Sequence, residues 1–301
     1  MKFITSLFAL IMLSQSAFAL EVQKVTDNVY ALVGEHAQRS PKNLGNNATF
    51  GVVVTNDGVV LIDSGGSWKG AAEIERTIAG ITDKAVKIVI NSGGQDHRWI
   101  GNGYWQAKGV KVIASQAAVA DHKDRGSLQM TALDVLLGKE LDGTEPAYAD
   151  TTFESEHKFS FGGVAFEIYH VGQAHTPGDS FIWLKDQRIM FSGDIVYVER
   201  ILGVGPQSHS GEWIKTFKTM AAFKPAHIIP GHGKTTTLEK ATAETLDYLV
   251  HLRKQMAVHI DNGGDMIGSV KIDQSKFSKL EQFDALAKRN AQQVYAEMEF
   301  E

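Results

Sequence analysis

The stretch that most constrains the fold is Asn91–Asn102, because it places ionisable side chains directly after an apolar run. That run, Val86–Ile90, has the length and composition of a buried strand. Gly93 and Gly94 then interrupt the apolar pattern, which indicates a tight exit from a strand into a loop. Since α/β proteins place their sites just beyond the carboxyl ends of buried strands, we expect chemistry in this stretch.

The residues before this stretch alternate between strand and helix. Gly51–Thr55 and Val59–Asp63 read as a hairpin around an Asp57-Gly58 turn, and Trp68–Ala79 has helical spacing. This alternation predicts a layered α/β domain. Further along we expect strands at 25–33, 110–114, 164–171, 180–184, 188–191 and 226–229, helices at 104–108, 117–126, 212–223, 239–261 and 276–299, and a loop at 144–156.

Composition narrows the class of protein. The chain has 301 residues, 43% hydrophobic and 22% charged, which is enough for one large globular domain. A net charge of -5 provides no basic surface, so nucleic acid is not expected as a partner. There is no cysteine, so any metal must be held by His, Asp or Glu.

The N-terminus predicts export. Lys2, an apolar run from Phe3 to Leu13 and the sequence Ala17-Phe18-Ala19 form a secretory signal peptide over residues 1–19. A membrane anchor would need about 20 apolar residues, and this run is shorter. Cleavage after Ala19 would leave residues 20–301 as one domain, periplasmic or secreted, without an integral membrane segment.

Four more ionisable residues stand at predicted strand ends. They are Asp63, His175 in Gly-Gln-Ala-His-Thr-Pro-Gly-Asp, Asp194 in Ser-Gly-Asp, and His232 in Pro-Gly-His-Gly. Taken singly, each is an ordinary loop or turn residue. Their common position after strands favours one shared site.

The order of these motifs resembles the metallo-β-lactamase superfamily along the whole chain. The resemblance implies a four-layer αββα sandwich, with a metal cleft built from strand-end loops at one edge. A C-terminal pair of helices, carrying Asn290 and Tyr295–Glu299, resembles exported members, including those that act beside periplasmic quinoprotein pathways. Zinc is the cofactor that the resemblance implies, and imidazole and carboxylate suit it.

The long motif of this family runs Asn-Thr-His-any-His-any-Asp-His and ends in Gly-Asn. Matched without gaps, its flanks fall on Asn91-Ser92 and Gly101-Asn102, and its four ligand positions fall on Gly93, Gln95, His97 and Arg98. In the family, one metal is held by the first two histidines and the equivalent of His175. The second is held by the Asp, the last His and the equivalent of His232, and the residue matching Asp194 often bridges both.

This departure makes a dinuclear site improbable, because glycine cannot ligate and a guanidinium stays charged and cannot coordinate. Two arrangements remain open. One zinc ion at most is held by His97, His175, Asp194 and His232, or no metal is bound and Arg98 forms a buried ion pair with Asp194 or Asp63. A gapped match, which places Asp96-His97 on the Asp-His of the motif, also stays open.

The leading functional prediction is an exported hydrolase acting on a small molecule. Asp194 would hold the metal and orient water, and Arg98 would bind an anionic group of the substrate or transition state. His209, in the loop after the Asp194 strand, is a second candidate for substrate binding. The alternative is a non-catalytic binding protein that uses the cleft and Arg98. Lactams, thioesters, lactones and phosphoesters all remain possible substrates, because fold does not fix function.

Overall fold

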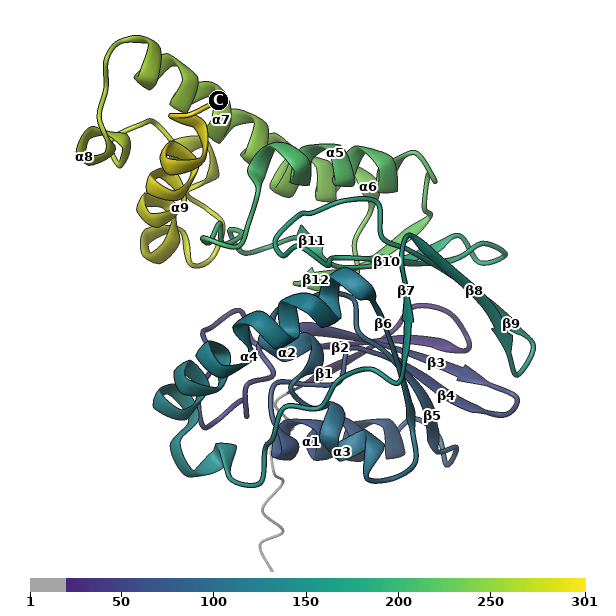
Figure 1. The fold of residues 1–301 in the computed structure, drawn as a ribbon. Helices are drawn as coiled ribbons and strands as arrows, with labels where there is room; N and C mark the ends of the chain where they lie inside the picture. Colours follow the sequence, from purple (N-terminus) through teal and green to yellow (C-terminus); the bar gives the residue numbers. More distant parts are fainter. Residues whose placement is uncertain (1–19) are drawn as a thin grey trace, which may run out of the picture.

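The protein is an αββα sandwich, in which two β-sheets pack face to face and helices cover both outer faces (Figure 1). The computed structural model describes residues 20–301, and the predicted signal peptide lies outside the described residues. The expected four-layer architecture is confirmed. Among residues 20–301, no helix combines the length and the apolar character required to cross a bilayer.

The first sheet has seven strands in chain order. Its pairs are antiparallel from β1 to β4 and parallel from β4 to β7. The strands are β1 Glu21–Lys24, β2 Val29–Val33, β3 Thr49–Thr55, β4 Gly58–Ile62, β5 Val86–Ile90, β6 Lys111–Ser115 and β7 Thr151–Phe153.

The second sheet has five strands in the order β12-β11-β10-β9-β8. Only the β11–β12 pair is parallel. The strands are β8 Glu156–Phe161, β9 Val164–Tyr169, β10 Phe181–Leu184, β11 Ile189–Tyr197 and β12 His227–His232.

Helices α1 and α3 lie on the outer face of the first sheet, and α5, α7 and α9 lie on the outer face of the second (Figure 1). The helices are α1 Trp68–Ala79, α2 Asp96–Trp99, α3 Asn102–Gln106, α4 Gln116–Leu137, α5 Ser210–Ala221, α6 Leu238–Ala241, α7 Asp247–Asp261, α8 Met266–Ser269 and α9 Phe283–Met298. Short 3₁₀ turns occupy Gly138–Leu141 and Ser275–Phe277, and a π-helical turn, Thr242–Leu246, joins α6 to α7.

Alternation along the strands builds the core. In β3, Phe50 and Val52 point to the helices outside the first sheet, whereas Val53 points between the two sheets. There it joins residues from the second sheet such as Ile182 and Phe191. Successive side chains of a strand face opposite sides, so a strand buried on both faces reads as an unbroken apolar run.

Two sequence-based expectations fail. The segment expected as a loop at 144–156 contains β7 and the start of β8, and β8 alternates between exposed and half-buried residues because it lies at a sheet edge. Helix α4 runs eleven residues beyond its predicted end at 126, to Leu137. Its later turns expose apolar residues, among them Leu128 and Val135, which obscures the helical pattern.

The fold brings the predicted site segments to one edge. Parallel strands β4 and β5 end side by side, so Asp63 and the stretch from Asn91 leave the first sheet together. Parallel strands β11 and β12 deliver Asp194 and His232 from the second sheet in the same way. Contacts of β3 with β11 and β12 join the two sheets at this edge.

Candidate metal centre and cleft

The stretch Asn91–Asn102 is clamped by its own flanks. The side chains of Asn91 and Asn102 exchange two amide hydrogen bonds of 3.0 and 2.9 Å, and Asn91 Nδ2 also donates to the Arg98 carbonyl at 2.7 Å. Between the flanks, one turn of helix, α2, carries His97 and Arg98 on consecutive positions. The flanking asparagines therefore fix the loop that presents the site.

Three buried donors converge at the closed end of the cleft: His97, Asp194 and His232. Asp194 Oδ2 lies 3.3 Å from His97 Nε2, and Asp194 Oδ1 lies 3.4 Å from His232 Nε2. Tetrahedral zinc ligands at about 2.1 Å from the ion are separated from one another by roughly 3.4 Å. The two histidines contact different oxygens of Asp194, and one ligand atom from each of the three residues lies within 4.8 Å of the others, so this group could hold a metal ion. Three of the four predicted ligands are thus brought together.

Asp96 orients His97 and does not take its place. Its Oδ1 lies 3.3 Å from His97 Nδ1, and it accepts from Arg39 Nε at 3.0 Å. Burial would raise the pKa of Asp96, but the Arg39 guanidinium holds it well below its ordinary value. Arg39 Nη2 also lies 3.2 Å from His97 Nδ1, so Asp96 and Arg39 together hold this edge of the ring and leave Nε2 toward Asp194. The structure thus brings His97, and not Asp96, together with Asp194 and His232.

Stacking and a long polar contact hold His232. Its ring stacks on Tyr197 at 4.5 Å between centroids and meets His97 edge-on at 5.0 Å. Burial lowers the pKa of His232 well below its usual value, so the ring is neutral. Arg200 Nη1 lies 3.4 Å from His232 Nδ1. A guanidinium can only donate, so this contact puts the ring proton on Nε2, and metal binding at Nε2 requires the contact to be released.

Arg98 is fully buried between two carboxylates. Its Nη2 and Nε donate to Asp194 at 2.6 and 3.2 Å, and its Nη1 donates to Asp63 Oδ2 at 2.8 Å. Two carbonyls, those of Thr49 and Gly231, accept its remaining donors at 3.1 and 2.8 Å. Burial opposes ionisation, but both carboxylates raise the pKa of Arg98 above its ordinary value.

This placement corrects the predicted role of Arg98. It does not line the cleft, and all its donors are engaged inside the protein, so it has nothing to offer a substrate. The buried ion pair considered as an alternative is present, and with both proposed partners. Burial would raise the pKa of Asp194, but Arg98 holds it well below its ordinary value, so the carboxylate stays ionised.

The first metal position of the family is filled by protein. A Cβ added to Gly93, the first missing-histidine position, would overlap Asp179 Oδ1, and at the second position the Gln95 side chain contacts His175. Asp179 accepts from the Thr176 backbone N–H at 2.9 Å and from the Thr176 hydroxyl. Burial raises the pKa of Asp179 to about 8. The Asp179 side chain therefore occupies the space beside Gly93 that a histidine would need.

His175 does not join the group of three, which corrects the predicted four-ligand set. Its Nε2 lies 3.2 Å from Gln95 Oε1, and its backbone carbonyl accepts from Ser208 Oγ at 2.9 Å. Burial lowers the pKa of His175 to about 4. A neutral histidine paired with an amide remains at the first position.

His209 also differs from its predicted role. It caps α5, where its Nδ1 accepts from the Glu212 N–H at 3.3 Å and lies 3.1 Å from Glu297 Oε1. His209, Glu297 and Glu301 could also hold an ion, but Arg253 already neutralises both glutamates. The cleft is instead lined by Gln207, two residues earlier.

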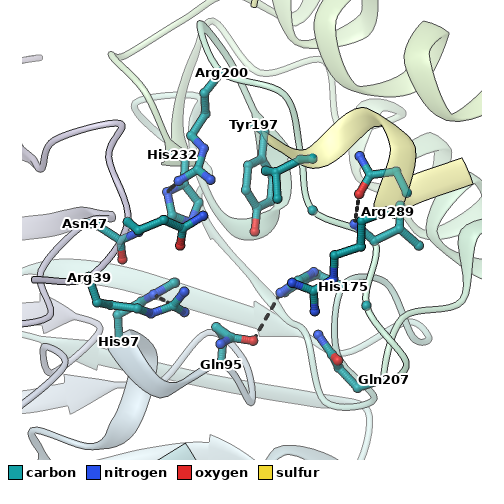
Figure 2. A pocket seen from close by; sticks show the side chains of 16 residues that line it. Arg39, Asn47, Gln95, His97, His175, Tyr197, Arg200, Gln207, His232 and Arg289 are labelled. Atoms are coloured by element: carbon teal, nitrogen blue, oxygen red, sulfur yellow. Dashed lines mark hydrogen bonds between the residues drawn. The ribbon is translucent and has the colours of Figure 1, made fainter. Parts of the chain in front are cut away.

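The cleft opens beside the three donors and is lined by cationic and amide side chains (Figure 2). Sequence reasoning missed three arginines there: Arg39 in the β2–β3 loop, Arg200 just after β11, and Arg289 on α9. No motif or spacing links them, so only the fold shows that they meet. The complete lining is Gln38, Arg39, Asn47, Gln95, His97, His175, Tyr197, Arg200, Gly203, Val204, Gly205, Gln207, His232, Leu286, Arg289 and Asn290.

An αββα sandwich with a His-Asp-His centre at its sheet edge defines the class as a metallohydrolase fold, and comparison with known proteins agrees. The family model of the metallo-beta-lactamase superfamily matches residues 45–232. The chain belongs to this superfamily.

Individual relatives are distant. A metallo-beta-lactamase type 2 from Elizabethkingia meningoseptica is 24% identical over 234 residues, which cover 76% of this chain and 85% of the relative. Another from Bacillus sp. (strain 170) is 24% identical over 187 residues, 61% of this chain and 65% of the relative. The structure of a metallo-beta-lactamase from Pontibacter korlensis superposes with a TM-score of 0.63 at 21% identity, covering 77% of this chain and 99% of that one. The structural likeness shows the shared fold.

Proposed function

We propose that the protein is an exported hydrolase with a single divalent metal, zinc by preference, held by His97, Asp194 and His232. The observation that carries the proposal is the spacing of these three buried donors, which suits one ion. Superfamily membership supports hydrolysis as the reaction type. The substrate is a small molecule that enters the cleft described above.

The chain's own residues have separate tasks in this proposal. A bound divalent cation would supply a water of lowered pKa and polarise the scissile carbonyl or phosphoryl group. Arg98 fixes the Asp194 carboxylate with two hydrogen bonds and keeps it ionised. Asp96 and Arg39 hold the Nδ1 edge of His97, and Tyr197 holds the His232 ring by stacking.

Export rests on the predicted signal peptide. Leu20, the predicted first residue after cleavage, packs into the core of the first sheet next to β1. Mass spectrometry of protein from a periplasmic extract should give a mature chain beginning at Leu20. A chain that retains Met1 and stays in the cytoplasm would refute export.

The test of hydrolysis is a panel of lactam, lactone, thioester and phosphoester substrates, assayed with added zinc. Wild type should cleave at least one class, and His97→Ala should lose that activity together with the metal. We expect little β-lactam cleavage, because the first metal position is filled. If His97→Ala retains full activity, the metal centre formed by His97 is refuted. If metal-loaded wild type cleaves no class, a non-catalytic binding protein becomes the better description.

A further inference from the structure

We infer that Arg39, Arg200 and Arg289 form a binding site for an oxyanion, a carboxylate or a phosphate group, beside the metal donors. As a description of the substrate, this inference rests on the proposed function, whereas the binding of an anion does not depend on a metal. Figure 2 shows the three guanidinium groups pointing into the cleft from different sides. Among residues 20–301, the lining of the cleft includes no carboxylate.

Arg200 is the main evidence. It is 4% exposed, and its Nε is buried without a hydrogen-bond partner among the described residues. A buried cation with an unused donor costs free energy unless a partner arrives. Its nearest carboxylates are already engaged, since Asp194 is bound by Arg98 and Glu281 lies 3.0 Å from His36. Arg200 lines the cleft, so its buried charge lies beside a space that an anion can enter.

Arg39 and Arg289 add charge from other parts of the chain. Arg39 is tied to Asp96, and its charge acts on Arg200, so two like charges lie beside the same cleft. Arg289 is an exposed residue of α9. Planar guanidinium groups bind carboxylate and phosphate through paired hydrogen bonds. An anion between them would relieve the repulsion and supply the missing acceptor.

A second buried polar atom without a hydrogen-bond partner narrows the chemistry expected of the ligand. Asn47 Oδ1 is buried without a partner among the described residues, while its Nδ2 donates to the Ala37 carbonyl at 3.0 Å. This oxygen needs a donor, such as a hydroxyl or amide N–H near the anionic group. Arg289 lies outside the matched family region, so the C-terminal helices give this cleft a feature that the family core does not supply.

Two neighbouring basic residues of α9, Lys288 and Arg289, allow a matched test. Arg289 lines the cleft, whereas Lys288 is equally exposed and does not. Acetate and inorganic phosphate are titrated into wild type, Arg289→Ala and Lys288→Ala by calorimetry at constant ionic strength. We expect saturable binding of at least one anion, weakened roughly tenfold or more by Arg289→Ala and less than about twofold by Lys288→Ala. Which of the two anions binds more tightly distinguishes a carboxylate from a phosphate substrate.

Arg200→Lys keeps the charge but loses the planar fork, and should weaken binding without unfolding the protein. The titrations are repeated after removal of metal by a chelator, so that binding to a metal is separated from binding to arginine. Binding that persists without metal supports the anion site even if no hydrolysis is found. The inference is overturned if neither anion saturates up to about 10 mM, or if both alanine variants weaken binding equally.

Discussion

The two metal positions of the cleft have diverged in opposite ways. At the second position His97 replaces the expected Asp and Arg98 the expected His, yet three donors still lie together, and Arg98 supports Asp194 from behind. At the first position the ligands are lost, and Asp179, Thr176 and a neutral His175 occupy the space. A ligand position survives replacement when the new side chain reaches the same point, and disappears when neighbouring groups fill the vacated volume.

The charges around the second position also limit the number of metal ions that the cleft can bind. Arg98 lies between Asp63 and Asp194, so one fixed cation sits behind the three donors. An ion between the three donors would meet that charge with Asp194 between them, and a second divalent ion would in addition lack ligands at the first position. At about 4 Å, two unit like charges repel by roughly 4 kcal/mol at an effective dielectric of 20. We therefore expect the cleft to bind one ion at most.

Replacing the buried Arg98 should have the largest effect on the free energy of unfolding. Arg98→Met leaves Asp63 and Asp194 buried without their partner, so the free energy of unfolding should fall by about 3–5 kcal/mol. Lys215→Met, which breaks an exposed pair with Glu212, should cost less than about 1 kcal/mol. Urea denaturation of both variants measures the difference. Equal small losses would show that Arg98 does not hold the second position together.

Histidine introduced at Gly93 should destabilise the protein, whereas histidine introduced at Gln95 should not. These are the two positions at which the family has histidine ligands of the first metal. Gly93→His forces a side chain into Asp179 and should lower the free energy of unfolding by about 1–3 kcal/mol. Gln95→His is the control, because Gln95 already points to His175 and can be replaced without overlap. Neither variant should bind a second metal equivalent. A stable Gly93→His variant with two equivalents would mean that the first site is vacant and not filled.

The buried carboxyl that fills the first position should make stability depend on pH. The folded-state pKa of Asp179 is about 8, above its unfolded value, so its contribution is complete at low pH and is lost as pH rises from about 4 to 8. The slope can reach about 1.4 kcal/mol per pH unit. Asp179→Asn should remove it, whereas the opposite slope from His175 below about pH 6.5 remains in both proteins. Unfolding curves at several pH values test this. Parallel curves for wild type and variant would contradict it.

The fold and the position of the site could be predicted from the sequence. The orientation of the side chains in the site could not. The apolar run of β5, the Asn91 and Asn102 flanks and the Pro-Gly-His-Gly turn are local patterns, and they predicted the sandwich and its cleft. Whether Arg98 points into the cleft or behind Asp194 depends on Thr49, Asp63 and Gly231, which lie on three other segments.

The same limit explains the missed residues of the cleft. Arg39, Arg200 and Arg289 are separated by long stretches of chain, and each looks like an ordinary surface arginine in the sequence. His209 looked better placed because it follows the Asp194 strand, yet a helix cap turned its ring to Glu297. Contacts between distant segments decide these cases, and single-sequence patterns do not contain them.

Metal content tests the central claim most directly. Wild type, His97→Ala and His175→Ala are dialysed against limiting zinc, and bound metal is measured by elemental analysis. The His-Asp-His centre predicts up to one equivalent in wild type, a loss of nearly all of it in His97→Ala, and wild-type content in His175→Ala. Two equivalents in wild type, equal loss in both variants, or no metal in wild type at saturating zinc would contradict a single centre formed by His97, Asp194 and His232.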